Sequence, residues 1–132
     1  YMLVSDVYNP LGTGQNSTAC FVNGNNTLTN YYYQYILADN TSIGASRVNS
    51  NSINMTLASS RSLSRTNIKI ANSGYVIMQS EQIYGYGGST PIIYNPYNAS
   101  TFTISSLTSI SLKGTLSNGI GVGSRFQLYK LI

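Results

Sequence analysis

The chain contains no histidine and no tryptophan, and it has one cysteine and three acidic residues among 132. Charged side chains make up 8% of the sequence, whereas an average soluble domain devotes about a quarter of its residues to them. Without histidine, the usual proton shuttle of acid–base catalysis is missing. Asp6, Asp39 and Glu81 fall in separate expected elements, which favours neither a catalytic carboxylate pair nor a set of metal ligands. We therefore expect a protein that is not an enzyme and uses no metal or cofactor.

Other absences restrict the class of protein further. A single cysteine excludes an intrachain disulfide, and the apolar neighbours of Cys20 favour a buried thiol over a reactive one. No apolar run has the length of a membrane span. The net charge is +4, but the seven basic residues are dispersed, with Arg61, Arg65 and Lys69 the nearest approach to a cluster, so nucleic-acid binding is not expected. The start at Tyr1 is interpreted as a secreted chain after removal of a signal peptide.

The shortage of titratable groups also predicts resistance to acid. Acid unfolding acts mainly through carboxylates that must be protonated and histidines that must become charged. Between neutral pH and about pH 2, only Asp6, Asp39, Glu81 and the C-terminal carboxylate can bind protons in this chain. We expect a fold that is nearly independent of pH over that interval, as an acidic or otherwise harsh extracellular habitat would require.

What the chain does contain is neutral and polar, arranged in short alternating runs. Ser, Thr, Asn and Gln supply roughly two fifths of the residues, and Ile, Val, Leu, Phe and Tyr alternate with them at the period of a half-buried strand. Turn signals such as Asn23-Gly24 and Asn95-Pro96 separate these runs. The expected fold class is all-β, an Ig-like or pilin-like sandwich of about nine or ten strands. The expected strands are 2–8, 18–22, 27–37, 45–49, 52–58, 66–71, 75–84, 92–94, 100–116 (broken near 105–106) and 124–132.

The two ends of the sequence differ in character. An apolar strand at 1–9 is followed by 10–15, where one proline and two glycines indicate an extended hinge. We expect 1–9 to be an extension that can pair away from its own domain, with 16–132 forming the β-sandwich domain. The last strand runs towards the end of the sequence and places Phe126, Leu128 and Ile132 on one face.

Two further sequence patterns, a run of glycines and a run of tyrosines, need interpretation. The Gly-x-Gly-x-Gly run at 119, 121 and 123 lacks the spacing of a phosphate-binding loop, so we interpret it as a place where another backbone or a large side chain packs closely. Tyr31, Tyr33 and Tyr35 share one face of a predicted strand. They are consistent with an aromatic ladder inside the sandwich, with a contact between subunits or with a face that binds glycans.

Five Asn-x-Ser/Thr sequons are present, and most of them lie in or beside predicted turns. In a secreted protein such asparagines are candidate acceptors of N-linked glycans. The candidate sites are Asn16, Asn25, Asn40, Asn54 and Asn98.

A neutral β-domain rich in Ser, Thr, Asn and Tyr, with sequons and a detachable first strand, resembles the subunits of filaments built by donor-strand complementation. The architecture is similar to that of type 1 pilins, and the composition is similar to that of the glycosylated thread filaments of thermoacidophilic archaea. The resemblance implies that the N-terminal strand of one subunit completes the sheet of its neighbour. It makes Leu3, Ser5 and Val7 the inserted face of the donor strand. It also makes the run that contains Phe126, Leu128 and Ile132 the wall of the acceptor groove.

The sequence and this resemblance together predict a structural subunit of an extracellular surface filament that serves adhesion or biofilm formation. Its partners would be copies of itself and covalent glycans, with no nucleic acid and no membrane span. Two alternatives remain open at this stage. One is a monomeric carbohydrate-binding or adhesin module of the cell surface that uses the tyrosine strand, and the other is a viral capsid or spike protein.

Overall fold

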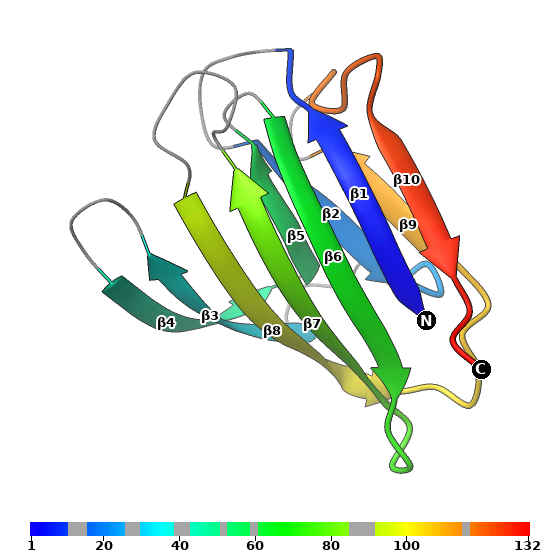
Figure 1. The fold of residues 1–132 in the computed structure, drawn as a ribbon. Helices are drawn as coiled ribbons and strands as arrows, with labels where there is room; N and C mark the ends of the chain where they lie inside the picture. Colours follow the sequence, from blue (N-terminus) through cyan, green and yellow to red (C-terminus); the bar gives the residue numbers. More distant parts are fainter. Residues whose placement is uncertain are drawn as a thin grey trace.

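The computed structural model describes residues 1–10, 16–25, 30–38, 43–50, 53–58, 61–84, 92–114 and 117–132. These residues form ten β-strands and no helix (Figure 1). The strands are β1 (Met2–Tyr8), β2 (Asn16–Val22), β3 (Tyr31–Ala38), β4 (Ile43–Ser50), β5 (Ile53–Ala58), β6 (Arg61–Ile70), β7 (Tyr75–Tyr84), β8 (Ile92–Thr103), β9 (Ile110–Gly114) and β10 (Arg125–Tyr129). The expected all-β class and the number of strands are confirmed.

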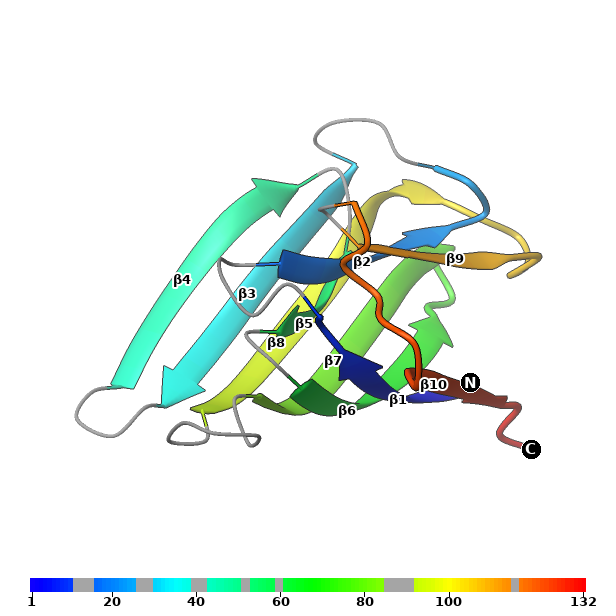
Figure 2. The same cartoon turned by 90° about the horizontal axis from the view of Figure 1, so that it is seen from above.

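The strands make two antiparallel sheets of unequal size. The large sheet has seven strands in the order β10-β1-β6-β7-β8-β3-β4, and the small sheet has three in the order β5-β2-β9. The small sheet lies against one face of the large one, and β4 lies at the side away from it (Figures 1 and 2). The result is a two-layer arrangement of the sandwich kind, in which the large sheet has an inner face towards the small sheet and an outer face that no described element covers.

The hydrophobic core lies between the two sheets. It contains Leu3, Cys20, Val22, Tyr31, Ile68, Val76 and Met78, all buried, with six partly buried apolar residues packed around them. Tyr31 joins the layers, because its hydroxyl on β3 accepts a hydrogen bond from the Val22 N–H on β2 at 3.1 Å and donates one to the Asn25 carbonyl at 2.8 Å. Its ring meets Phe102 edge to face, with centroids 5.4 Å apart.

Part of the inner face is polar even though it is buried. The hydroxyls of Ser5 and Ser64 lie 2.5 Å apart, and those of Thr66 and Ser80 lie 2.7 Å apart, so each pair shares a hydrogen bond across neighbouring strands. Among the described residues, three further buried side chains on this face have polar atoms without a hydrogen-bond partner: Ser62, Gln82 and Asn98. The inner face is thus stabilised in part by apolar packing of the core residues and in part by hydrogen bonds between uncharged serine and threonine side chains.

Two expectations about strand bounds are wrong. The strand expected at 66–71 begins at Arg61, because its first half has an inverted pattern that places Ser62 and Ser64 inside and Leu63 outside. Asn95-Pro96, expected as a turn, lies inside the continuous strand β8. The missing N–H of Pro96 is tolerated because the β7–β8 ladder is interrupted there, between the pairs Gln82↔Tyr94 and Gln79↔Tyr97.

The Asn23-Gly24 turn does not join two neighbouring strands into a hairpin. Asn23 and Gly24 both have positive φ, as a tight turn requires, but β2 pairs with β5 and β9 and not with β3, which follows it. Instead, the Asn23 side-chain oxygen accepts hydrogen bonds from the N–H groups of Thr108 and Ser109. The turn therefore anchors the segment before β9. Among the described residues, no helical segment has the length and hydropathy to cross a bilayer.

Candidate assembly site

The first strand of the chain is an interior strand of the large sheet. β1 pairs on one side with β6, from Met2↔Asn67 to Tyr8↔Arg61, and on the other side with β10, from Met2↔Tyr129 to Asp6↔Arg125. We call the space that it fills between β6 and β10 the β1 slot. In the isolated chain, β1 is therefore paired along both edges within its own sheet, and its pairing with a neighbouring copy stays a prediction.

The side chains of β1 follow the predicted alternation. Leu3, Ser5 and Val7 face inwards and are 3%, 1% and 0% exposed. Leu3 belongs to the core, and Ser5 forms the hydrogen bond with Ser64. The face expected to be inserted into an acceptor groove is thus the face that fills the β1 slot in its own chain.

The opposite face of β1 carries the acid that an apolar groove would not accept. Asp6 receives two hydrogen bonds from the Arg61 guanidinium, Nε to Oδ1 at 2.8 Å and Nη2 to Oδ2 at 2.5 Å. This bidentate pair lies on the outer face and is partly solvated. An exposed ion pair adds about 1 kcal/mol at most, so it orients the strand more than it stabilises the fold.

Both ends of β1 are tied to the rest of the sheet. At the start, Tyr1 and Ile68 exchange backbone hydrogen bonds of 2.8 and 2.9 Å. At the end, the Gly121 N–H donates to the Tyr8 carbonyl at 2.7 Å, and the Tyr8 N–H donates to the Ser124 hydroxyl at 3.0 Å. We call this contact of Tyr8 with Gly121 and Ser124 the exit clamp, because it holds the strand where the chain leaves the sheet.

The exit clamp explains the glycine run. A Cβ on Gly121 would lie 2.8 Å from both Pro10 Cδ and Tyr8 Cδ1, so only glycine allows this approach. The interpretation of the run as a close packing point is confirmed at this position. Gly123 has a φ of 93° and ends the same turn before β10. Pro10 begins the expected hinge, and 11–15 lie outside the described residues.

The residues expected to line the acceptor groove lie on or beside β10. Phe126 and Leu128 pair with Ser5 and Leu3 across the β1–β10 ladder, and Phe126 packs against the core. Ile132 lies beyond the strand and is fully exposed, so it is not part of the slot. The expected donor and acceptor are therefore neighbours in a single sheet. The pairing of β1 with β6, the second wall of the slot, was not predicted, because alternation does not show which strands are neighbours.

The tyrosine strand does not form one exposed face. Tyr31 is buried in the core, which removes it from any glycan-binding surface. Tyr33 and Tyr35 are half-buried and stacked, with centroids 5.8 Å apart, and Tyr35 also packs on Tyr94. Tyr33 and Tyr35 thus form a stacked pair on the inner face, and Tyr31 packs separately in the core against Phe102. The exposed tyrosine of this strand is Tyr32, whose ring lies under the Arg47 guanidinium at 5.4 Å.

The sequons differ in accessibility. Asn98 is 2% exposed on the inner face, so its amide cannot carry a glycan in the folded chain. Asn25 follows β2 and is half-buried beside Asn30, which donates a hydrogen bond to it. Asn16 and Asn54 belong to strands of the small sheet, with side chains outside the described part, and Asn40 lies outside the described residues.

The described residues offer little for covalent or metal chemistry. Within them, no three His, Cys, Asp or Glu side chains lie close enough to hold a metal ion. Burial raises the pKa of the Cys20 thiol to about 12, so it stays protonated and unreactive. Burial likewise raises the pKa of Tyr31, against the lowering effect of the Val22 hydrogen bond.

Comparisons of the chain with protein-family models, with curated proteins and with solved structures find no match. The β1 slot and the outer face of the large sheet are therefore interpreted on their own geometry.

Proposed function

We propose that this chain is a structural subunit that assembles into an extracellular filament by exchanging its N-terminal strand between copies. The observation that carries the proposal is the β1 slot. A terminal strand with a buried inner face fills a gap between two other strands, and a predicted hinge follows it. When β1 occupies the slot of a neighbouring copy, it makes the same contacts as in the slot of its own chain. The exchange therefore costs little free energy.

The geometry also supports an open-ended polymer. The strand that a copy gives and the slot that it offers are different surfaces, so a copy can give one strand and receive another. If the hinge directs each strand to the next copy, the contacts continue from copy to copy without closing into a ring. The low charge of the chain limits repulsion between such copies, and adhesion or biofilm formation is the use that we propose for the filament.

A disulfide across the slot tests this mechanism. Because Tyr1 and Ile68 form a hydrogen-bonded pair, the adjacent pair Met2 and Asn67 is a non-hydrogen-bonded one, with Cα atoms about 4.5 Å apart. That separation suits a disulfide. The double variant Met2→Cys and Asn67→Cys, oxidised as a dilute monomer, should stay unpolymerised in electron micrographs. Reduction should restore filaments. The buried Cys20 does not compete for the new thiols.

The order of the steps provides the control. If the reduced variant first assembles and is then oxidised, the bond should join different copies and give a covalent ladder on a non-reducing gel. Filaments that grow equally well from the oxidised monomer, or assembled material with bonds only within chains, would contradict strand exchange.

One observation supports a second candidate, a carbohydrate-binding module. On the outer face, a groove of about 540 Å³ lies between the exposed rings of Tyr32 and Tyr75, and Ser73 and Thr101 add hydroxyls to its wall. Aromatic rings with neutral hydrogen-bonding groups suit a sugar better than a charged ligand. Binding on a glycan array by a monomeric chain, lost in Tyr75→Ala and kept in Tyr8→Ala, would favour this function.

A further inference from the structure

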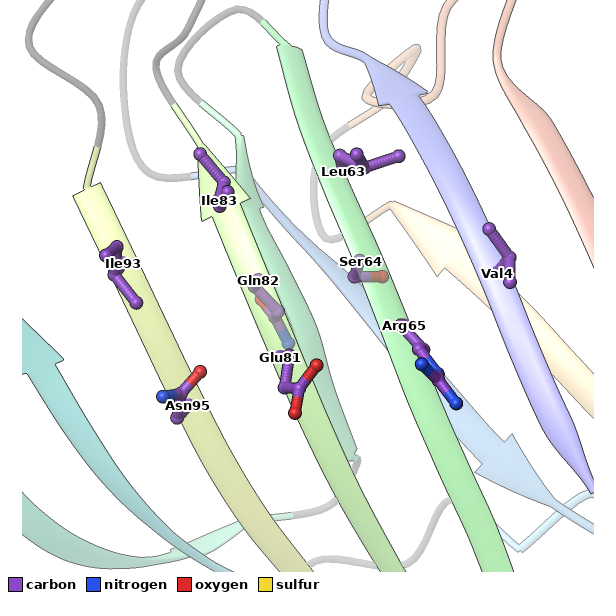
Figure 3. A pocket seen from close by; sticks show the side chains of 9 residues that line it. All are labelled: Val4, Leu63, Ser64, Arg65, Glu81, Gln82, Ile83, Ile93 and Asn95. Carbon is purple, nitrogen blue, oxygen red and sulfur yellow. The ribbon is translucent and has the colours of Figure 1, made fainter.

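The outer face of the large sheet carries an apolar row that crosses five strands. The cross-strand pairs Leu63↔Ile83, Ile83↔Ile93, Ile93↔Ala38 and Ala38↔Ile43 place these residues side by side on β6, β7, β8, β3 and β4. Figure 3 shows three of them, Leu63, Ile83 and Ile93, in a line across β6, β7 and β8. At the spacing of neighbouring strands, the row is about 19 Å long. We call it the outer apolar row.

Four members of this row are exposed in the isolated chain, and Ala38 is partly exposed. Leu63, Ile83 and Ile93 are 46%, 43% and 51% exposed, and Ile43 at the sheet edge is 81% exposed. Single exposed apolar residues are common, but a contiguous row across most of a sheet usually marks an interaction surface.

The inner face behind the row has the opposite character. On β6 and β7, the residues that alternate with Leu63 and Ile83 are Ser62, Ser64 and Gln82, and all three are buried. The usual pattern, apolar towards the core and polar towards solvent, is therefore reversed at this end of the sheet. A reversed pattern is expected where the outer face becomes an interior face in an assembly.

We infer that the outer apolar row is a contact between two copies of this chain, packed with the outer faces of their large sheets against each other. This contact is separate from the β1 slot and does not depend on strand exchange. Each copy contributes the same surface, so the contact closes on itself and joins copies in pairs.

A second copy fits the row as its occupant, because the row can meet itself across a two-fold axis. The next row on this face contains Arg65 opposite Glu81, followed by Asn95 on β8, and with the apolar residues these three line a shallow groove of about 470 Å³ (Figure 3). Arg65 and Glu81 offset each other beside the row, whereas Arg47 and Lys69, two further bases of the outer face, lie farther along their strands. A two-fold axis parallel to the strands at Ile93, the middle of the row, would bring Leu63 of one copy to Ile43 of the other and Ile83 to Ala38.

The outer face is large enough for a stable contact between two copies. β6 and β7 have 10 residues each, which is about 33 Å, and seven strands span about 29 Å. The face therefore offers roughly 900 Å², compared with the 800 Å² or so that each partner contributes to a standard interface.

The sequons of the described residues leave this surface clear, and Asn40 lies outside those residues. Within the described part of the chain, Asn98 faces inwards, Asn25 follows β2, and Asn16 and Asn54 belong to the small sheet. Glycans on the remaining acceptors of that part would be attached away from the outer face.

The test uses the oxidised Met2→Cys and Asn67→Cys chain, in which strand exchange is blocked, followed by sedimentation velocity up to millimolar concentration. We expect a reversible dimer. Adding Ile83→Lys should weaken dimerisation about thirty-fold or more, because each copy carries the substitution at the contact. Ser111→Lys adds the same charge at an exposed position of β9 in the small sheet, away from the outer face, and should have little effect.

A positional readout accompanies the affinity. Ile93 is the middle residue of the row, so an added Ile93→Cys should form a disulfide between copies, whereas Ser111→Cys, exposed on β9 of the small sheet, should not. Circular dichroism verifies that each variant is folded, and Ile93→Ser replaces Ile83→Lys if the lysine variant does not fold.

The outcomes separate this inference from strand exchange. A locked chain that stays monomeric, a Ser111→Lys chain that loses dimerisation as strongly as Ile83→Lys, or association only with an added glycan would overturn the outer-face contact and leave strand exchange standing. Filament growth by the oxidised locked chain would contradict strand exchange and would not bear on the outer-face contact. Dimers that depend on Ile83 support the outer-face contact in either case.

Discussion

At the scale of single residues, the most unusual side chains are the buried amides without partners. Asn98 is almost fully buried, and neither its Nδ2 nor its Oδ1 has a hydrogen-bond partner. A buried polar group that makes no hydrogen bond costs about 1–3 kcal/mol. Such a cost is unusual in a stable β-sheet, and it allows a direct test of the buried polar face.

We expect Asn98→Leu to stabilise the isolated chain by about 1–3 kcal/mol, because an apolar side chain of similar volume removes the unpaired amide. Ser64→Ala is the matched control. It should destabilise the chain by about 1–2 kcal/mol, since it leaves the buried Ser5 hydroxyl without its partner. Urea unfolding followed by circular dichroism measures both. A loss of stability in Asn98→Leu would show that the amide has a partner in solution.

The buried thiol and phenol predict sensitivity to alkali. Burial raises the pKa of the Cys20 thiol from its ordinary value of 9.0 to about 12 in the fold, so between these values the unfolded chain releases a proton that the folded chain retains. Stability is therefore complete below pH 9 and falls as the pH rises, by at most about 4 kcal/mol at pH 12. The raised pKa of Tyr31 acts in the same direction.

Thermal unfolding between pH 7 and pH 11 should show this fall, and Cys20→Ala should flatten it. The comparison concerns the slope of stability against pH, because removal of the thiol also leaves a small cavity. An equal slope in both proteins would assign the alkaline loss to other groups.

At the scale of elements, the exit clamp sets how firmly β1 is held. Gly121→Ala would place a methyl group against Tyr8 and Pro10, and we expect a destabilisation of about 1–3 kcal/mol. Hydrogen exchange in β1 should accelerate more than exchange in β7. The control is Gly44→Ala in β4, where an added Cβ meets nothing within 4 Å. Equal effects of the two substitutions on β1 would show that the clamp does not retain the strand.

Local pattern predicted some elements closely and failed at others for identifiable reasons. β1 and β7 have the predicted bounds, 2–8 and 75–84, because their alternation is regular. β6 was shortened because Ser62 and Ser64 are buried, which reverses the hydrophobic pattern. β8 was divided at Pro96, whose missing N–H is accommodated by a local gap in the ladder.

The partners of each strand were beyond the reach of the sequence. Period-two alternation identifies the two faces of a strand but does not show which other strand lies beside it. The inward face of β1 was predicted correctly at Leu3, Ser5 and Val7. Its position between β6 and β10 was not, because pairing over such sequence distances depends on the whole fold. The outer apolar row was missed for the same reason, since its five members are adjacent only through four cross-strand registers.

At the scale of the whole molecule, the scarcity of charge predicts a fold that acid barely affects. The exposed Asp6–Arg61 ion pair contributes about 1 kcal/mol at most, and few other carboxylates can bind protons. We expect the free energy of unfolding at pH 2 to lie within about 2 kcal/mol of its value at pH 7. Thermal unfolding at the two pH values measures it, and a cooperative acid transition near pH 4 would contradict the expectation.

The two proposed contacts would give an assembly with two kinds of joint. Strand exchange through the β1 slot is strong and directional, whereas the outer-face contact is weaker and pairs copies side by side. Substitutions in the outer apolar row should thus change how filaments bundle without stopping their growth.

The place of β1 in the sheet also has a consequence for the order in which the chain folds. β1 is synthesised before all the other described strands, but β6 follows more than fifty residues later, and β10 comes last. At the usual speed of translation, β1 waits several seconds for its first neighbour. Pairing over such distances is slow in any case. During that delay β1 is free to pair with another copy, so conditions that keep many nascent copies close together would favour pairing between copies over pairing within one chain.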